Sequence, residues 1–226
     1  EQEDCVGRFI PLPSPFLGKY ANRHCASNNN LLLVGTSIRF RFLRISSTPQ
    51  PSQYLRYLKD KVSFIGNLTK KPKGCTVYRP YGRGHNDIND ARFIETRCPG
   101  IAIMEECDHK HFIENHLLKC RLLVLDHNST TLNVALAANI PTVCFWEDDA
   151  WSICRQAQPH FDKLKECKIL FHDPVQAAEH VNRVWDDVSA WWNDEKVQQS
   201  RREWVGLFAL NSRLWWMDWI KILSRL

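Results

Sequence analysis

The sequence predicts an α/β protein with a doubly wound parallel sheet and a helical C-terminal tail. Short apolar segments alternate with helical patterns along the chain, which is typical of repeated strand–helix–strand units. The apolar segments carry few charges, as do strands that are buried on both faces of a sheet. With 226 residues, 44% of them hydrophobic, the chain is long enough to bury the core of such a domain.

The first half of the chain contains three expected strands. They are apolar and bounded by polar turns, a proline or a glycine-containing loop, and they lie at 31–35, 75–79 and 100–104. Residues 53–59 have a short helical pattern, and residues 62–65 form a short apolar segment. Residues 109–119 are amphipathic and predict a helix before the next strand.

Residues 121–146 are the most informative part of the sequence. Leu122–Leu125 is expected to be a buried strand, and the hydroxyls that follow it suit the N-terminus of a helix at 132–139. Pro141 ends that helix, and residues 142–146 give another buried strand. The turn between strand and helix lies at the carboxyl edge of the sheet, where open α/β sheets bind ligands. A hydroxyl-rich helix N-terminus suits a phosphate or a carboxylate, although an ordinary capped helix would look the same.

The remaining elements are mainly helical. A helix is expected at 151–165, a strand at 169–171 and a helix at 174–192, and two further helices complete the chain at 195–209 and 214–226. The last part is rich in tryptophan, which suits either an interfacial membrane helix or a tail packed on this domain or its neighbour. We favour packing, because acidic residues interrupt the stretch.

The domain organisation expected from these patterns has three parts. Residues 1–30 include the proline-rich segment PLPSP and are interpreted as a linker from a preceding domain that is absent from this sequence. Residues 31–190 form the α/β domain, and residues 191–226 form the tryptophan-rich tail.

Charge and cysteine usage restrict the function class and the compartment. A formal charge of +5 without long basic runs fits a small anionic ligand or an anionic membrane surface, and nucleic acid is not expected as a partner. No apolar run approaches the roughly 18–20 residues of a membrane span, and no signal peptide is visible. Nine cysteines without a CxxC pair indicate reduced thiols and a cytoplasmic protein.

No metal site is expected. The best candidate ligands have a spacing that would not place all of them on one helical face, and they are Cys107, His109, His111, His116 and Cys120. The sequence also lacks GxSxG, P-loop, HExxH and GxGxxG motifs, so the usual nucleophile and metal-hydrolase signatures are missing.

Polar side chains follow the expected strands, and a parallel sheet would gather them at one edge. Arginines there can hold a diphosphate in a bidentate manner, and hydroxyls and helix N–H groups can complete its binding site. The candidate ligand-binding residues are Gly35, Thr36, Ser37, Arg39, Arg79, Tyr81, Glu106, Asp126, His127, Asn128, Ser129, Thr130, Thr131 and Asn133.

Several motifs resemble a bacterial family of transferases for surface carbohydrate, which is similar to GT-B glycosyltransferases. The resemblance extends from about residue 75 to the C-terminus. It is carried by Arg79-Pro-Tyr, by the run from Asp126 to Thr131, by Ala137-Ala-Asn-Ile-Pro-Thr, and by tail motifs such as Ala157-Gln-Pro-His-Phe-Asp and Trp185-Asp-Asp. It implies a Rossmann-like GT-B C-terminal domain, which holds a nucleotide-sugar donor, while an N-terminal domain would bind the acceptor.

Carried over to this sequence, the resemblance assigns Arg79 and residues 129–131 to the donor phosphates, and His127 and Asn128 to the phosphate or the sugar. Where GT-B donor domains often have a glutamate for the ribose, this helix offers Asn133. No cofactor or metal is implied beyond the donor. The implied function is sugar transfer to a cell-surface polysaccharide or glycolipid, in the cytoplasm or at the inner-membrane surface. The alternatives are a polyol-phosphate transferase, a sugar-nucleotide epimerase, or a non-catalytic interaction module on the same fold.

Overall fold

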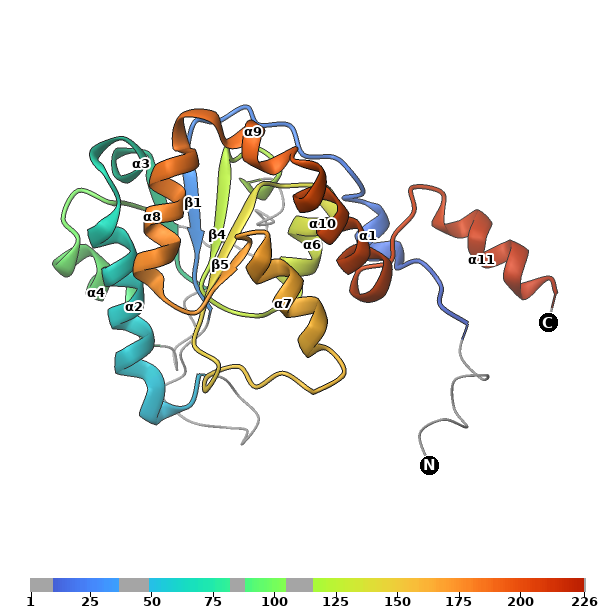
Figure 1. Cartoon of the computed structure of the whole chain (residues 1–226), viewed down its shortest axis with the longest axis horizontal. Coiled ribbons are helices and arrows are strands. Elements are labelled where there is room, and N and C mark those ends of the chain that lie inside the picture. The colour runs from blue at the N-terminus through green and yellow to red at the C-terminus, as the bar shows by residue number, and fades with distance from the viewer. Residues whose placement is uncertain (1–9, 37–48, 82–87, 105–115, 226) are drawn as a thin grey trace.

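A computed structural model describes residues 10–36, 49–81, 88–104 and 116–225. Its centre is a six-stranded sheet in the order β3-β2-β1-β4-β5-β6, and all five strand pairings are parallel (Figure 1). The strands are β1 Leu31–Val34, β2 Thr76–Arg79, β3 Ala102–Ile103, β4 Leu122–Leu125, β5 Thr142–Phe145 and β6 Leu170–Phe171. This order is that of a doubly wound sheet, so the expected fold class is confirmed.

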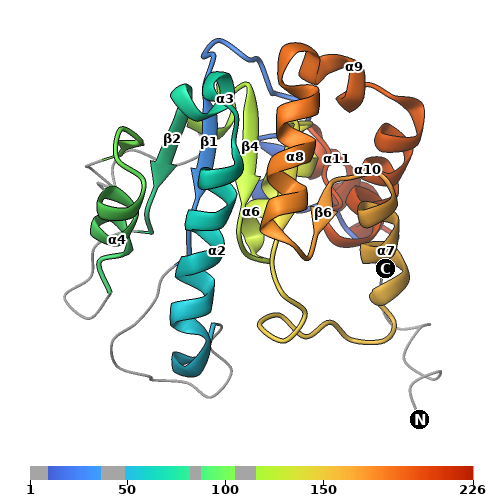
Figure 2. The same cartoon turned by 60° about the vertical axis from the view of Figure 1, so that its left-hand side comes forward.

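Helices cover both faces of the sheet, as Figure 2 shows. One face carries α2 (Tyr54–Asn67), α4 (Asp90–Arg97) and α8 (Pro174–Val184), and the other carries α6 (Thr130–Ala138), α7 (Gln158–Glu166) and α10 (Glu195–Phe208). Alternate residues of the central strands fill two separate apolar cores, one under each layer of helices.

Short helices join these layers. The described chain also contains α1 (Pro15–Gly18), η2 (Pro51–Gln53), α3 (Lys70–Gly74), η3 (Trp185–Asp187) and α9 (Val188–Trp192). Pro174 occupies the first turn of α8, where its missing N–H costs nothing, and Asp173 caps the same turn. Among the described residues, no helix is both long and apolar enough to cross a bilayer.

The C-terminal helix α11 (Trp215–Leu223) lies away from the sheet and beside α1 (Figure 1). Its inner side contacts the N-terminal segment, because the Trp219 indole donates a hydrogen bond to the Pro13 carbonyl at 2.9 Å. Its outer side is apolar and exposed, and Trp216, Met217 and Ile220 are each about half or more accessible. The tail therefore packs in part on this domain and leaves one apolar face open.

Four expectations about secondary structure need correction. The segments at 53–59 and 62–65 belong to one continuous helix, α2. The helix expected at 151–165 begins only at Gln158, because Pro159 is tolerated in the first turn of a helix and not in its interior. The polar loop after residue 80 contains α4, and the 174–192 helix is divided into α8, η3 and α9. Most of the helix expected at 109–119 lies outside the described residues.

Candidate functional site

The candidate site lies at the carboxyl ends of β1 and β4, where the strand order reverses. The connection after β1 leads to α2 on one face of the sheet, and the connection after β4 leads to α6 on the other. Val34 and Leu125 are register partners at this edge, so Gly35-Thr36 and Asp126-His127 leave the sheet side by side. Such a switch point is where open α/β sheets bind ligands.

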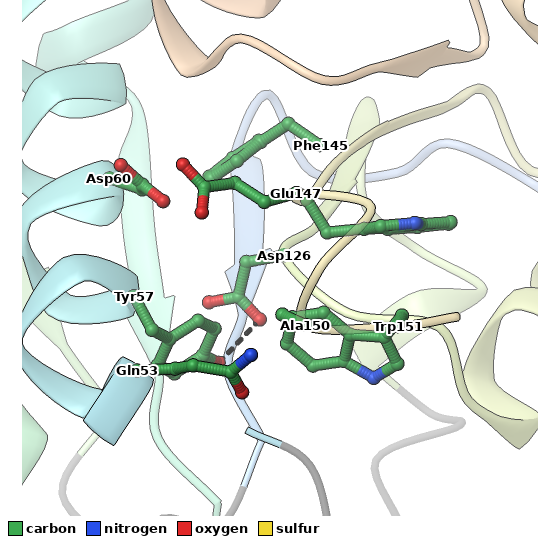
Figure 3. Close-up of a pocket in the computed structure, with 9 residues that line it drawn as sticks. Gln53, Tyr57, Asp60, Asp126, Phe145, Glu147, Ala150 and Trp151 are labelled. Carbon is green, nitrogen blue, oxygen red and sulfur yellow. Dashed lines mark hydrogen bonds between the residues drawn. The ribbon is translucent and has the colours of Figure 1, made fainter. Parts of the chain in front are cut away.

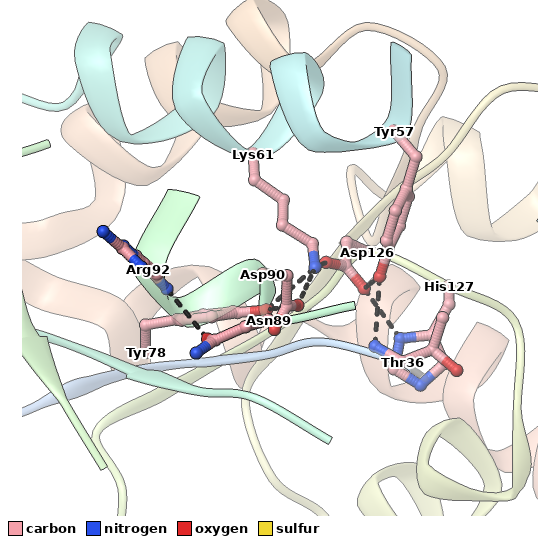
Figure 4. A network of polar contacts seen from close by, with 9 residues as sticks. All are labelled: Thr36, Tyr57, Lys61, Tyr78, Asn89, Asp90, Arg92, Asp126 and His127. Carbon is pink, nitrogen blue, oxygen red and sulfur yellow. Dashed lines mark hydrogen bonds and ion pairs between the residues drawn. The ribbon is translucent and has the colours of Figure 1, made fainter. Parts of the chain in front are cut away.

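A chain of hydrogen bonds joins these two strand ends through α2 (Figure 4). The Thr36 amide donates to the Tyr57 hydroxyl at 3.0 Å, and that hydroxyl donates to Asp126 Oδ1 at 2.7 Å. His127 Nδ1 lies 2.8 Å from the same carboxylate oxygen. Asp126 therefore fixes the positions of both segments that leave the sheet at the switch point.

Lys61 lies beneath this chain of bonds and is completely buried. Its ammonium is 3.3 Å from Asp126 Oδ2 and 2.9 Å from Asp90 Oδ2, and it donates to the Tyr78 hydroxyl at 2.8 Å. The Tyr78 hydroxyl in turn donates to Asp90. We call Tyr57, Lys61, Tyr78, Asp90 and Asp126 the buried polar cluster.

The buried polar cluster keeps a carboxylate ionised where burial opposes it. Desolvation is the largest influence on Asp126 and raises its pKa, but Lys61 and the hydrogen bond from His127 outweigh it. The pKa of the Asp126 carboxyl is therefore below its usual range, and the group is an anion at neutral pH. Burial and then the Asp126 charge raise the pKa of the Tyr57 phenol well above 10, so Tyr57 remains a hydrogen-bond donor.

Gly35 is required by the close approach of the buried polar cluster. A Cβ at this position would overlap the Tyr78 hydroxyl and lie 2.9 Å from Lys61 Nζ. The absence of a side chain thus lets the cluster reach the end of β1.

The N-terminus of α6 opens on the other side of the switch point. Ser129 caps the helix, and its hydroxyl accepts a hydrogen bond from the Thr131 amide at 3.2 Å. Thr130 is exposed, and Asn128, Ser129 and Thr131 are partly exposed. The first turn contains no acidic residue, so the positive end of the helix dipole is available to an anion.

Arg79 ends β2 next to β1, where its carbonyl accepts a hydrogen bond from the Gly35 amide at 3.0 Å. Val77 packs into the core on the α6 face, and strand alternation places Arg79 on that same face. Among the described residues, its guanidinium has no hydrogen-bond or ion-pair partner. Arg79 is thus a cation on the same side of the sheet as the α6 N-terminus.

A small pocket opens on the α2 side of Asp126, between α2 and the segment after β5 (Figure 3). It has room for about one water molecule. The carboxylates of Asp60 and Glu147 face each other at this pocket, and Glu147 also pairs with Arg56. Burial and then the Glu147 charge raise the pKa of Asp60 to about 6.

The structure brings together many of the residues predicted from the sequence. Those that lie at the switch point or the adjoining end of β2 are Gly35, Thr36, Arg79, Asp126, His127, Asn128, Ser129, Thr130 and Thr131. Tyr81 is 56% exposed just beyond β2. Asn133 points to α10, where its side-chain oxygen accepts a hydrogen bond from the Trp204 indole at 3.0 Å. Ser37, Arg39 and Glu106 lie outside the described residues.

The contribution of α2 and α4 to this site was not predicted from the sequence. Tyr57, Lys61 and Phe64 recur at helical spacing on the buried side of α2, so a lysine stands within an apolar stripe. The position of Lys61 in this stripe could have predicted a buried ionic site, because a lysine there needs a buried anionic partner. The partners themselves, Asp90 and Asp126, are too distant in sequence to be identified by pattern.

Comparisons with known proteins agree with this fold. A family model described as LIC12162 family transferase matches residues 1–223. Among solved structures, the chain is similar to WaaG, a glycosyltransferase involved in lipopolysaccharide biosynthesis, with a TM-score of 0.50 and 12% sequence identity. The match covers 91% of this chain and 54% of that one, so this chain spans about half the length of its structural neighbour. No curated protein matches.

Proposed function

We propose that this chain, which belongs to the LIC12162 family of transferases, is the donor-binding half of a glycosyltransferase that uses a nucleotide-sugar. The observation that carries the proposal is the grouping of Arg79 with the open N-terminus of α6 at the switch point of the sheet. The fold shared with a glycosyltransferase supports it. The acceptor would be a surface polysaccharide or glycolipid.

The chemistry of this grouping suits the departure of a nucleoside diphosphate. When the bond between the sugar and the phosphate breaks, negative charge grows on the phosphate oxygens. Arg79 can form two parallel hydrogen bonds to such oxygens, and the first amides of α6 can donate to them. Donors fixed in place before the reaction stabilise developing charge without reorganisation.

The acceptor half would complete the cleft, and we assign the outer face of α11 to contact with it. Four large apolar side chains on this helix are about half exposed or more, namely Trp216, Met217, Ile220 and Leu223. The chain covers only 54% of its structural neighbour, which leaves a second domain to account for. A membrane surface is the competing occupant of this face.

A thermal-shift screen against UDP, GDP, CDP, dTDP, CMP and their common sugars tests the proposal. A ligand at about 100 times its Kd adds about 2.7 kcal/mol to the free energy of unfolding, which for a chain of this size raises Tm by roughly 5–10 °C. Arg79→Ala should weaken binding, whereas Arg183→Ala, an exposed arginine on α8, should not. A flat response in folded protein would contradict the proposal, and vesicle binding without any nucleotide shift would favour the interaction module.

A further inference from the structure

We propose that this chain binds an uncharged sugar in a pocket at the edge of the sheet opposite the switch point. The pocket lies at the amino ends of β1, β4 and β5, beside α9 (Figure 1), and its volume of about 530 Å³ is usual for a small-molecule site. We call it the amino-edge pocket, and its lining includes Ser27, Asn28, Asn139, Trp192 and Asn193. The four residues of β1 span about 13 Å, so a ligand here is separate from one at the proposed donor site.

The amino-edge pocket is formed by segments that are distant in sequence and are fixed by hydrogen bonds. Part of its wall comes from residues 22–29, where the amides of Asn22 and His24 donate to carbonyls at the end of α6, each at 3.0 Å. Another part comes from Asn139 and Trp192, and the Trp192 indole donates to Asn139 Oδ1 at 2.9 Å. Walls held in this way need little further ordering when a ligand binds, which favours affinity.

The pocket offers side chains that can both donate and accept hydrogen bonds. Ser27, Asn28 and Asn193 line it, and their side chains have no hydrogen-bond partner among the described residues. The Asn139 side-chain oxygen already accepts from the Trp192 indole and the Gln198 amide, which leaves the Asn139 amide nitrogen to donate elsewhere. Each hydroxyl of a sugar is likewise both a donor and an acceptor, so these amides and this hydroxyl match it.

The charges at the amino-edge pocket are balanced, which favours a neutral ligand. Arg121 already donates to three oxygen atoms of the chain, and Lys71 pairs with Asp186 at 2.9 Å. The Asp187 carboxylate accepts hydrogen bonds from two groups in the first turn of α9. Burial lowers the pKa of His24, so its imidazole is neutral at pH 7. Two cations thus offset two carboxylates in the described lining and its neighbour Lys71, and neither a phosphate nor a metal ion would find an uncompensated partner.

The buried part of the lining is apolar, and it comprises Ala138, Pro141, Val188 and Trp192. A sugar ring carries hydroxyls around its edge and apolar C–H groups on its faces, so it matches a pocket that has both kinds of surface. A peptide backbone also donates and accepts hydrogen bonds. However, β1, β4 and β5 are interior strands of the sheet, so the pocket has no free strand edge with which a peptide could pair. These features together favour an uncharged sugar.

Proton–nitrogen correlation NMR of the whole chain tests the proposal, with glucose, galactose, mannose and N-acetylglucosamine added in turn. We expect at least one of these sugars to shift the side-chain amide signals of Asn28, Asn139 and Asn193 in a saturable manner. No saturable shift with any of the sugars would overturn the proposal, and so would shifts that only triglycine amide produces. Sugar-induced shifts confined to Asn128 and Ser129 would also overturn it, while leaving the proposed donor site in place.

Two variants decide whether the amino-edge pocket is where the sugar binds. Asn28→Ala and Asn193→Ala each remove an exposed amide that makes no hydrogen bond within the described residues, so both proteins should fold and melt as the wild type does. The loss of one hydrogen bond to the sugar should raise Kd by about 2- to 10-fold in each variant. Gln176→Ala is the matched control, because it removes an exposed amide from α8 outside the pocket, and its Kd should be unchanged. A Kd equal to that of the wild type in both pocket variants would refute the site.

Discussion

Replacement of Lys61 by methionine is the sharpest test of the buried polar cluster. Methionine retains most of the side-chain volume and removes the ammonium, which leaves the Asp90 and Asp126 carboxylates buried without their cation. Breaking a buried ion pair in this way costs about 3–5 kcal/mol. In a chain of this size each kcal/mol corresponds to roughly 2–4 °C, so Tm should fall by about 6–20 °C.

The penalty should depend on pH in a defined direction. Without Lys61, burial is no longer outweighed, and it raises the pKa of the Asp126 carboxyl in the folded state above the value near 3.9 of the unfolded chain. A group whose pKa is raised by folding contributes stability below that pKa and loses it as the pH rises through it. The variant should therefore recover part of its stability between pH 7 and pH 5.

Urea unfolding followed by circular dichroism at both pH values measures this effect. Lys59→Met is the matched control, because Lys59 is an exposed lysine on the same helix, and it should change stability by less than about 0.5 kcal/mol. Other groups that titrate between pH 5 and 7 affect wild type and variant alike, so they cancel in the difference. A penalty below about 1 kcal/mol, or one that is equal at both pH values, would refute the assignment of Lys61 as counter-ion of ionised carboxylates.

Three further predictions concern other parts of the fold. Burial, followed by the Arg183 charge, lowers the pKa of His180 to about 4, so the protein loses stability as the pH falls below 6.5. In urea unfolding, the wild type should lose about 2 kcal/mol between pH 7 and pH 5 that the His180→Phe variant does not lose, and equal losses in both proteins would contradict this. Gly35→Ala should lower the free energy of unfolding by about 1–3 kcal/mol, because the added Cβ has no room. Gly66→Ala, which has open space around it on α2, should be neutral or stabilising, and equal effects of the two variants in a thermal melt would disprove the steric argument. Ile220→Ser should leave the stability of this chain unchanged within about 0.5 kcal/mol, and it should weaken the binding of a separately produced acceptor half. A large loss of stability would show instead that the outer face of α11 is already packed against this chain.

The layout of the sheet was predictable because each central strand can be recognised from its own residues. β1, β4 and β5 are fully buried; β1 and β4 are apolar throughout, β5 is apolar after Thr142, and polar residues follow these strands. Parallel geometry then brings those ends to one edge without further information. The strand–turn–helix unit around Asp126 could be placed for this reason, together with its cap at Ser129.

The parts that were missed depend on contacts between distant residues. α2 was divided in two because the charge of Lys61 interrupts an apolar pattern, and only Asp90 and Asp126 from other elements make its burial possible. α4 has a weakly apolar face, and it was hidden in a polar segment whose helix signal is the single cap Asn89. The start of α7, by contrast, was predictable from Pro159, since a proline cannot lie in the interior of the longer helix that was expected.

The position of the buried polar cluster has a consequence for how the two faces of the sheet communicate. Asp126 accepts hydrogen bonds from Tyr57 on α2 and from His127 on the α6 side, so both layers of helices depend on one carboxylate. A ligand that strengthens the contact between His127 and Asp126 would by linkage stabilise the anchoring of α2 as well. An apolar cluster of equal volume would hold α2 at least as firmly, but it would not respond to a ligand at α6. Hydrogen exchange of the α2 amides, slower with bound nucleotide in wild type and unchanged in His127→Gln, would reveal this coupling.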